Sequence, residues 1–115
     1  MQPVILIIEP RPEVAAALQE VVTSANYRAR VIPHLERLAD VGAQPAAIIV
    51  RIAFEGSEPA HAAIAKLPPA HPPIIAIAWE DDEAAEATRL KCDVVLRGAK
   101  DIGRLCEVLT RVVHA

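Results

Sequence analysis

Two charged residues follow apolar runs of the chain, at positions where side chains often carry chemistry. Glu9 comes directly after Val4–Ile8, and Arg51 comes directly after Ala46–Val50. A carboxylate and a guanidinium at neighbouring strand ends can form a charge-assisted pair, and we expect this pair to hold the loop from Ile52 to Glu58 in one conformation. Arginine is a permanent cation without nucleophilic character, so Arg51 cannot accept a phosphoryl group as a carboxylate can.

No motif for a cofactor or an activated nucleophile occurs in the sequence. It contains no G-x-G-x-x-G, no G-x-x-x-x-G-K-[ST] and no G-x-S-x-G, and it has only four glycines. We therefore expect no enzymatic activity and no cofactor. The alternative is a small-molecule site at the carboxyl ends of the strands, where Glu9, Arg51, His34 and Asp81 could converge.

The acidic segment Glu80–Glu83 lies where a helix is expected to begin. Carboxylates there complement the exposed amides and the helix dipole, so we interpret the segment as a cap rather than a metal site. Trp79 precedes it, and we expect this side chain to pack into the space left by Ala78, with an exposed anchor for a partner as the alternative. The two cysteines and four histidines show no metal-binding spacing, so no metal site is predicted.

Length and charge limit the classes of function that fit the chain. Its 115 residues suffice for one globular domain, predicted over residues 1–115. The formal net charge is -3 and the basic residues are scattered, so nucleic acid is not expected as a direct partner. No apolar stretch reaches the roughly 20 residues that span a bilayer, and no signal peptide is evident, so a cytoplasmic protein is expected.

Five apolar runs are typical of buried strands, at residues 4–8, 28–32, 46–52, 74–78 and 94–96. Between and after them, helical spacing of apolar residues or helix-starting prolines predicts helices over residues 12–27, 33–41 and 60–67 and after residue 80. Asp101 is the predicted cap of a last helix whose inward face contains Ile102, Leu105, Leu109 and Val112.

This alternation indicates an α/β fold. Right-handed crossovers between buried strands give an open parallel sheet with helices on both faces. We predict a flavodoxin-like, doubly wound (βα)5 domain with a five-stranded parallel sheet in the strand order 2-1-3-4-5.

Four segments, at residues 4–12, 45–56, 73–79 and 92–100, give the chain a pattern that resembles the receiver domain of bacterial response regulators in two-component signalling. The resemblance covers essentially the whole chain and lies in the order of elements more than in the site chemistry. In that family an acidic pair binds magnesium, an aspartate accepts the phosphoryl group, and a hydroxyl residue and a lysine contact it.

The present residues at those positions depart from the family pattern. Glu9 and Pro10 stand at the acidic pair, Arg51 at the phosphoacceptor and Ala78 at the hydroxyl position. Val95 stands at the aromatic switch position, and either Gly98 or Lys100 stands at the lysine position. The resemblance therefore implies a pseudo-receiver that has lost phosphorylation and binds no metal.

What the resemblance implies is a phosphorylation-independent protein-interaction module in bacterial signal transduction. Its partner would be another signalling protein or a second copy, as a homodimer, bound through the fourth helix, fifth strand and fifth helix. That predicted face comprises Ala84, Ala87, Leu90, Val95, Arg97, Arg104 and Arg111. A further alternative is a working receiver with an altered acceptor, either Glu9 or Asp93.

Overall fold

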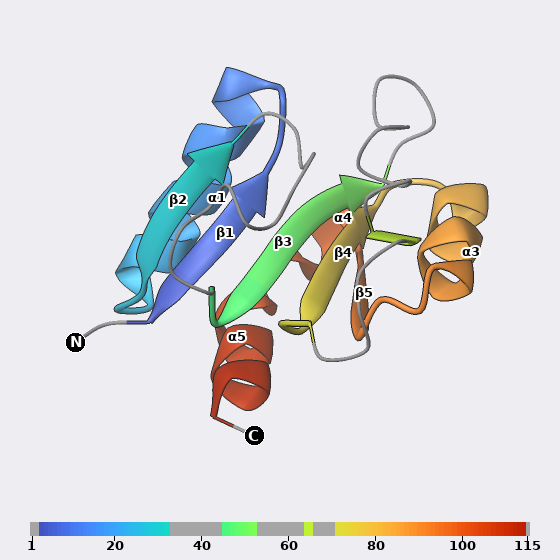
Figure 1. The fold of residues 1–115 in the computed structure, drawn as a ribbon. Coiled ribbons are helices and arrows are strands. Elements are labelled where there is room, and N and C mark those ends of the chain that lie inside the picture. The colour runs from blue at the N-terminus through green and yellow to red at the C-terminus, as the bar shows by residue number, and fades with distance from the viewer. Residues whose placement is uncertain (1–2, 33–44, 53–63, 66–70, 115) are drawn as a thin grey trace.

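The computed structural model describes residues 3–32, 45–52, 64–65 and 71–114. The elements follow in the order β1 (Val4–Ile8), α1 (Pro12–Ser24), β2 (Arg28–Ile32), β3 (Ala47–Ile52), β4 (Ile74–Ala78), α3 (Asp81–Arg89), β5 (Val94–Arg97), α4 (Gly98–Ile102) and α5 (Leu105–Val113) (Figure 1). All five predicted strands are confirmed to within a residue at each end.

The strands form one parallel sheet in the order β2-β1-β3-β4-β5. This is the predicted doubly wound topology, in which all strands end at the same edge. The central strands β1, β3 and β4 are buried on both faces, as their continuous aliphatic runs require. The outer strands differ: β2 is largely exposed and carries Arg28 and Arg30, whereas β5 has four residues and ends at Arg97.

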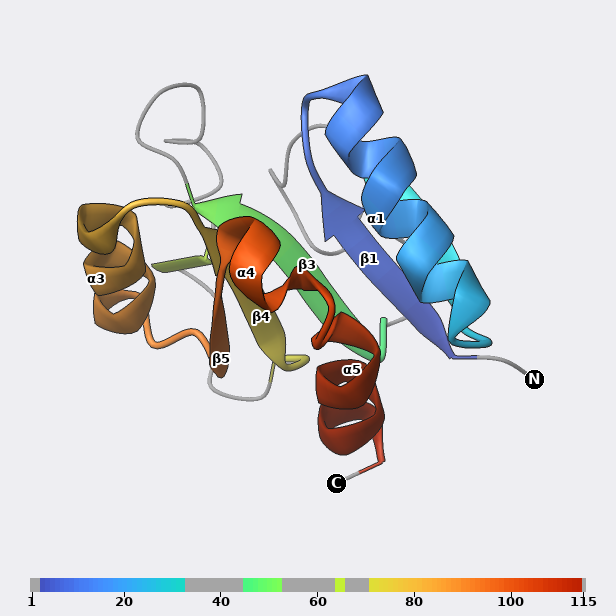
Figure 2. The same cartoon turned by 180° about the vertical axis from the view of Figure 1, so that it is seen from behind.

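Helices cover the two faces of the sheet and create two core clusters. On one face, α1 and α5 bury a cluster that includes Ile7 and Leu109, and α4 lies on the same side (Figure 2). On the other face, α3 packs Ala87 against residues such as Val50, and Ile64 joins this cluster from a helical segment. The domain is therefore a three-layer α/β sandwich.

Local signals explain where the described helices begin and end. Pro12 occupies the first turn of α1, where its fixed φ suits a helix and its missing N–H has no intrahelical role. Asn26 and Lys91, with φ of 69° and 62°, take the left-handed conformation just after α1 and α3. Residues with a short polar or flexible side chain tolerate this conformation without the clash that a β-branched residue meets.

The last helix differs from the prediction. A single helix capped by Asp101 was expected, but the segment is split into α4 and α5, separated by Gly103 and Arg104. Asp101 lies within α4, and its carboxylate accepts a hydrogen bond of 2.9 Å from the Arg97 backbone N–H. Asp101 therefore satisfies a backbone N–H at the start of α4 and does not cap α5.

Two predicted helices, at residues 33–41 and 60–67, lie outside the described residues except for the helical pair at 64 and 65. In the part of the chain that the structure describes, no helix combines the length and apolar character needed to cross a membrane.

Candidate functional site at the carboxyl edge of the sheet

The register of the sheet brings the predicted site residues to one edge. Ile8 pairs with Val50, so the next residues, Glu9 and Arg51, stand side by side at the ends of β1 and β3. Further along, Ala78 pairs with Arg97, so Trp79 and Gly98 follow at the ends of β4 and β5. Since side chains alternate between the faces of a strand, Glu9 and Arg51 point to the face covered by α1. The edge therefore gathers the strand-end residues Glu9, Arg51, Ala78, Trp79 and Gly98.

The predicted pair between Glu9 and Arg51 is not formed. Glu9 is buried, with 3% of its surface exposed, and its Oε1 accepts a hydrogen bond of 3.1 Å from the Arg11 backbone N–H. Its Oε2 and the Nε of Arg51 are both buried and have no hydrogen-bond partner among the described residues. Glu9 and Arg51 are thus neighbours in the backbone register of β1 and β3, but their carboxylate and guanidinium groups do not form an ion pair.

Arg51 instead contacts Trp79. The guanidinium carbon lies 5.7 Å from the centroid of the indole ring, a distance at which the ring quadrupole attracts a cation. Arg51 is half-buried, so this contact takes place in a partly desolvated setting. The side chain was expected to pair with Glu9, but its guanidinium lies against an aromatic ring and not a carboxylate.

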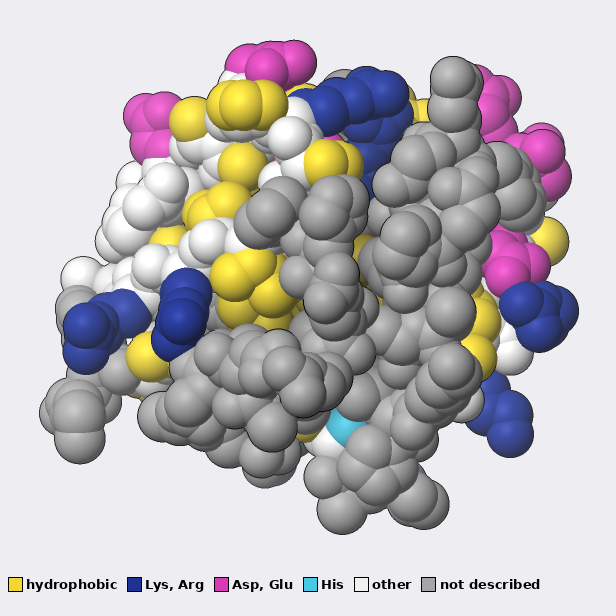
Figure 3. Space-filling view, turned by 45° about the horizontal axis from the view of Figure 1, so that its top comes forward, with side chains coloured by type: hydrophobic (Ala, Val, Ile, Leu, Met, Phe, Trp, Pro, Cys, Tyr) yellow, Lys and Arg dark blue, Asp and Glu magenta, His cyan; other side chains and the backbone are white. Residues whose placement is uncertain are grey.

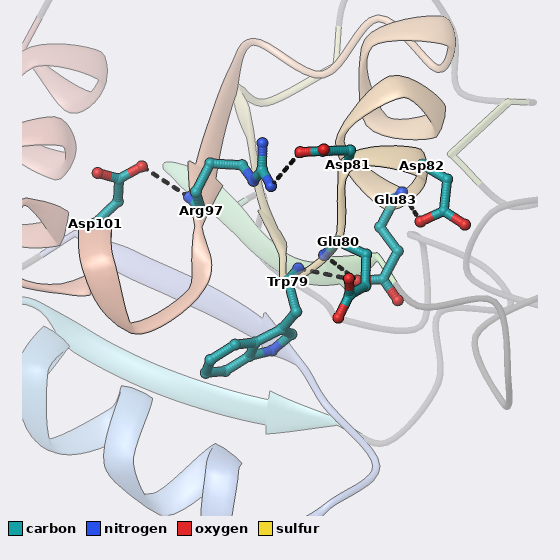
Figure 4. A network of polar contacts seen from close by, with 7 residues as sticks. All are labelled: Trp79, Glu80, Asp81, Asp82, Glu83, Arg97 and Asp101. Atoms are coloured by element: carbon teal, nitrogen blue, oxygen red, sulfur yellow. Dashed lines mark hydrogen bonds and ion pairs between the residues drawn. The ribbon is translucent and has the colours of Figure 1, made fainter.

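Trp79 does not fill the space beside Ala78 as expected. It is 47% exposed, whereas Ala78 is fully buried. The indole extends away from the Glu80–Glu83 turn and toward the opposite side from the Arg97 guanidinium (Figure 4). The indole is exposed, as the alternative of an anchor for a partner requires, and the contact with a partner stays a prediction.

Gly98 permits the position of the indole ring. A Cβ added to Gly98 would lie 2.6 Å from Cε3 of Trp79, closer than real Cβ contacts, and the φ of Gly98 is +52°. Only glycine combines this backbone conformation with this close approach at no steric cost. The glycine at the predicted lysine position therefore has a structural role, while Lys100 is exposed on α4.

The acidic segment is confirmed as a helix cap. Oε1 of Glu83 accepts hydrogen bonds from the backbone N–H groups of Trp79, at 2.9 Å, and Glu80, at 3.1 Å (Figure 4). These bonds satisfy donors that precede α3 and fix the chain where Trp79 leaves β4. Asp81 forms an ion pair of 2.7 Å with Arg97, so the cap and the end of β5 are linked.

Pro10 and Val95 have no group that could take part in phosphoryl transfer, and Asp93 lies away from this edge. Pro10 is exposed and has no side-chain oxygen, and Val95 is half-buried among residues that pack on the α3 face. Asp93 lies before β5, at the opposite edge of the sheet, where its carboxylate accepts a 2.7 Å hydrogen bond from the Ile74 N–H. This placement removes Asp93 as an altered acceptor at this edge. His34 lies outside the described residues.

These residues do not fit a magnesium ion. Magnesium requires several hard oxygen ligands in near-octahedral arrangement. Only one carboxylate, that of Glu9, occupies the position of the acidic pair, and Arg51 places a cation beside it. No group of three or more potential metal ligands occurs within the described ranges.

Two members of the predicted interaction face are core residues. Ala87 is fully buried and Leu90 is 9% exposed, because both lie on the stripe of α3 that packs against the sheet. Helical periodicity predicts that such a stripe exists but does not say which partner covers it. The other members are accessible: Ala84, Val95 and Arg97 are half-buried, and Arg104 and Arg111 are exposed.

A groove beside the site had no counterpart in the predictions. It has a volume of about 370 Å³ and lies between the residues of α1 from Glu13 to Val21 on one side and Trp79, Gly98 and Ile102 on the other. Viewed from the carboxyl edge, the space-filling surface shows apolar side chains exposed next to basic and acidic ones (Figure 3). The signal in the sequence that could have indicated the groove is Ala17 on α1, since a small side chain leaves space beside a helix.

Comparison with known proteins shows similarity in structure without similarity in sequence. The sequence matches no protein-family model and no curated protein. A BeF3-activated DrrB receiver domain has a TM-score of 0.80 and 8% identity, over 100% of both chains. A response regulator receiver protein from Pseudoalteromonas atlantica has a TM-score of 0.80 and 14% identity, over 97% of this chain and 98% of that chain.

A sensor protein from Polaromonas sp. JS666 is also similar, with a TM-score of 0.79 and 19% identity over 99% of this chain and 98% of that chain. At these identities the similarity establishes the fold. The resemblance deduced from the sequence is confirmed at that level: this chain has the fold of response regulator receiver domains.

Proposed function

We propose that this receiver-fold chain is a phosphorylation-independent protein-interaction module of bacterial signal transduction, which binds another signalling protein or a second copy of itself. The observation that carries the proposal is the environment of Arg51. A guanidinium 5.7 Å from the Trp79 ring occupies the end of β3, where the family has its reactive aspartate. No carboxylate can be phosphorylated at that position.

The loss of neighbouring groups supports the same proposal. Ala78, at the end of β4, offers no hydroxyl to follow a phosphoryl group, and Val95, in β5, offers no aromatic ring to couple to it. Gly98, one of the two residues predicted at the lysine position, has no side chain and contacts the Trp79 ring. With these groups absent, the domain acts as a constant binding surface and not as a covalent switch.

The proposed binding surface is the α3–β5–α5 face, defined here as Ala84, Val95, Arg97, Arg104 and Arg111. Its two exposed arginines lie on α5 or directly before it. Basic side chains at the rim of an interface favour an acidic partner and guide its orientation. Arg97 is paired with Asp81 at 2.7 Å, and Arg104 is paired with Asp101 at the longer distance of 4.0 Å. Arg111 and the more loosely paired Arg104 are therefore the residues whose charge a partner would meet.

The absence of phosphorylation is tested by intact-mass measurement after incubation with a small phosphodonor and magnesium. We expect the mass of the wild-type chain to stay unchanged, because neither Arg51 nor Pro10 can act as acceptor or ligand. A stoichiometric gain of one phosphoryl group would overturn the proposal. The chain would then be a receiver that is phosphorylated, with Glu9 as the first candidate acceptor.

The binding surface is tested by comparing the proteins captured from a native lysate by wild type and by an Arg104→Glu, Arg111→Glu variant. Arg28→Glu, an equally exposed reversal on the far strand β2, is the matched control. We expect the double reversal to lose the captured partner and the control to keep it. Sedimentation at high concentration examines self-association with the same variants. Equal capture by all three proteins would show that the working surface lies elsewhere.

A further inference from the structure

Two buried polar atoms at the carboxyl edge lack a partner although they belong to neighbouring strand positions. Glu9 is 3% exposed, and neither its Oε2 nor the Nε of Arg51 has a hydrogen-bond partner among the described residues. Ile8 pairs with Val50, so Glu9 and Arg51 follow on strands that lie about 4.8 Å apart, and both side chains point to the α1 face. One atom is an acceptor and the other a donor, so a turn of the Arg51 side chain toward Glu9 would satisfy both.

The present partner of Arg51 lies on its other side. β3 lies between β1 and β4 in the sheet (Figure 1), and Trp79 directly follows β4. The guanidinium carbon of Arg51 is 5.7 Å from the centroid of the indole ring, close to the limit of about 6 Å for a cation–π contact. A movement of the guanidinium toward Glu9 therefore ends its contact with the ring.

Each of the two arrangements leaves one group without compensation. With Arg51 at the ring, the buried carboxylate of Glu9 has one hydrogen bond among the described residues, of 3.1 Å from the Arg11 N–H. With Arg51 at Glu9, the ring of Trp79 loses its cation. A buried carboxylate without a counter-charge is unfavourable, and so is the loss of a cation–π contact in a partly desolvated setting. These opposing costs bring the two arrangements close together in free energy.

The ring itself is held in place in both arrangements. Its Cε3 lies against Gly98, where any added Cβ would be only 2.6 Å away, and the Trp79 backbone N–H is bound to Glu83 at 2.9 Å. Neither contact involves Arg51. The difference between the arrangements is therefore the charge beside an aromatic side chain that is 47% exposed.

We propose that Arg51 is a two-position switch, whose guanidinium moves between the Trp79 ring and the Glu9 carboxylate and so places a positive charge beside the exposed ring or removes it. A partner that brings an acidic group to the ring binds the first arrangement more tightly, and one that brings only apolar groups binds the second. The switch involves no covalent step. It does not use the α3–β5–α5 face, so the function proposed above and the switch are tested by different results.

The position of Arg51 is measured from the chemical shifts of its side-chain protons in the full chain. Protons that lie over an indole ring are displaced upfield, and both Trp79→Leu and the urea-unfolded wild type give the reference without that ring. Glu9→Gln removes the charge that competes for the guanidinium, so we expect a larger displacement in this variant than in wild type. A doubling corresponds to two equally populated positions in wild type. Slow exchange would instead give two sets of Arg51 signals, of which Glu9→Gln should keep one.

Glu13→Gln is the matched control for a general effect of charge. Glu13 is an exposed carboxylate in the first turn of α1 and lines the same groove as Trp79. Its replacement removes one negative charge near the ring but leaves the buried carboxylate of Glu9 in place. We expect the displacement of the Arg51 protons to stay at its wild-type value, with dispersed amide spectra showing that the variants are folded.

The charge beside the ring is measured by quenching the fluorescence of the single tryptophan. A guanidinium at the ring attracts iodide, so it raises quenching by iodide relative to the neutral quencher acrylamide. We expect this ratio to rise in Glu9→Gln, to fall in Arg51→Gln and to stay near the wild-type value in Glu13→Gln.

Two results would overturn the proposal. The first is an equal displacement of the Arg51 protons in wild type and in Glu9→Gln, because Arg51 would then hold one position whatever the charge of Glu9. The second is an iodide-to-acrylamide ratio that Glu13→Gln changes as much as Glu9→Gln does, because the ratio would then report the net charge of the region and not the position of Arg51.

Discussion

The two edges of the sheet satisfy their polar groups very differently. At the amino edge, the Asp93 carboxylate accepts a 2.7 Å hydrogen bond from the Ile74 N–H, and the Ile74 carbonyl accepts one of 2.9 Å from the Asp93 N–H. At the carboxyl edge, three buried atoms have no hydrogen-bond partner among the described residues: Glu9 Oε2, Arg51 Nε and Arg97 Nε.

This difference indicates that the polar groups of the amino edge are arranged to stabilise the fold. A buried polar atom without a partner costs about 1–3 kcal/mol, so substitutions at these three positions should show how much of that cost the carboxyl edge bears. Asp93 and Ile74 satisfy each other's hydrogen-bonding groups, and the stability that these bonds contribute is enough to explain their arrangement. The unsatisfied groups at the end of β1, β3 and β5 mark the edge where binding is to be sought, and their cost can be measured.

The largest expected effect is that of Gly98→Ala. The new Cβ would lie 2.6 Å from Trp79 Cε3, and alanine at a φ of +52° is strained, so the free energy of unfolding should fall by about 1–2 kcal/mol. Urea denaturation measures the change. Gly103→Ala is the matched control, because nothing lies within 4 Å of its added Cβ. Equal losses for both glycines would contradict the contact with Trp79.

Removing the satisfied carboxylate at the amino edge should have the next largest effect. Asp93→Ala leaves the Ile74 N–H without its 2.7 Å acceptor, and stability should fall by about 1 kcal/mol. Asp93→Asn keeps an oxygen acceptor and should retain most of the stability. If the asparagine variant is as unstable as the alanine variant, the charge of Asp93 matters more than this hydrogen bond.

The corresponding change at the carboxyl edge should have the opposite sign. Glu9→Gln keeps an acceptor for the Arg11 N–H and removes a buried charge whose second oxygen has no partner, so stability should rise by about 0.5 kcal/mol. Thermal unfolding at constant pH measures this shift. A loss larger than about 1 kcal/mol would show that the charge of Glu9 is compensated in solution, with Arg51 as the nearest candidate.

The smallest expected effect is a pH dependence at the amino edge. Burial, with a further contribution from the charge of Asp93, raises the pKa of the Cys92 thiol from its ordinary value of 9.0 to about 11. A raised pKa in the folded state means that the stability contributed by the neutral thiol is complete below pH 9 and is lost as the pH rises toward 11. Unfolding free energies measured across this range should fall less steeply for Cys92→Ala than for wild type.

Much of the fold was predictable because its central strands are unambiguous. Runs such as Val4–Ile8 and Ile74–Ala78 are aliphatic without interruption, which is typical of strands covered on both faces, and their alternation with helices leaves few topologies. The cap at Glu83 was predictable for a similar reason, because its chemistry acts over a few neighbouring residues.

The errors concern contacts between residues distant in sequence. The sequence contains Gly103 but does not reveal that the Asp101 carboxylate accepts a hydrogen bond from the Arg97 N–H at the start of a separate short helix, α4. It places Glu9 beside Arg51 but does not show that the indole of Trp79 attracts the guanidinium instead. Competition between partners for one side chain depends on three-dimensional distances, which periodicity does not contain.

The arginines on the outer strands have a consequence for how copies of this chain can associate. β2 presents Arg28 on one edge of the sheet, and β5 offers only four residues and ends in Arg97 on the other. Short or charged edge strands resist the addition of a strand from another molecule, because like charges would be brought into register. Any self-association is therefore expected to use helix surfaces, and the sheet itself is protected against growth into continuous intermolecular β-structure.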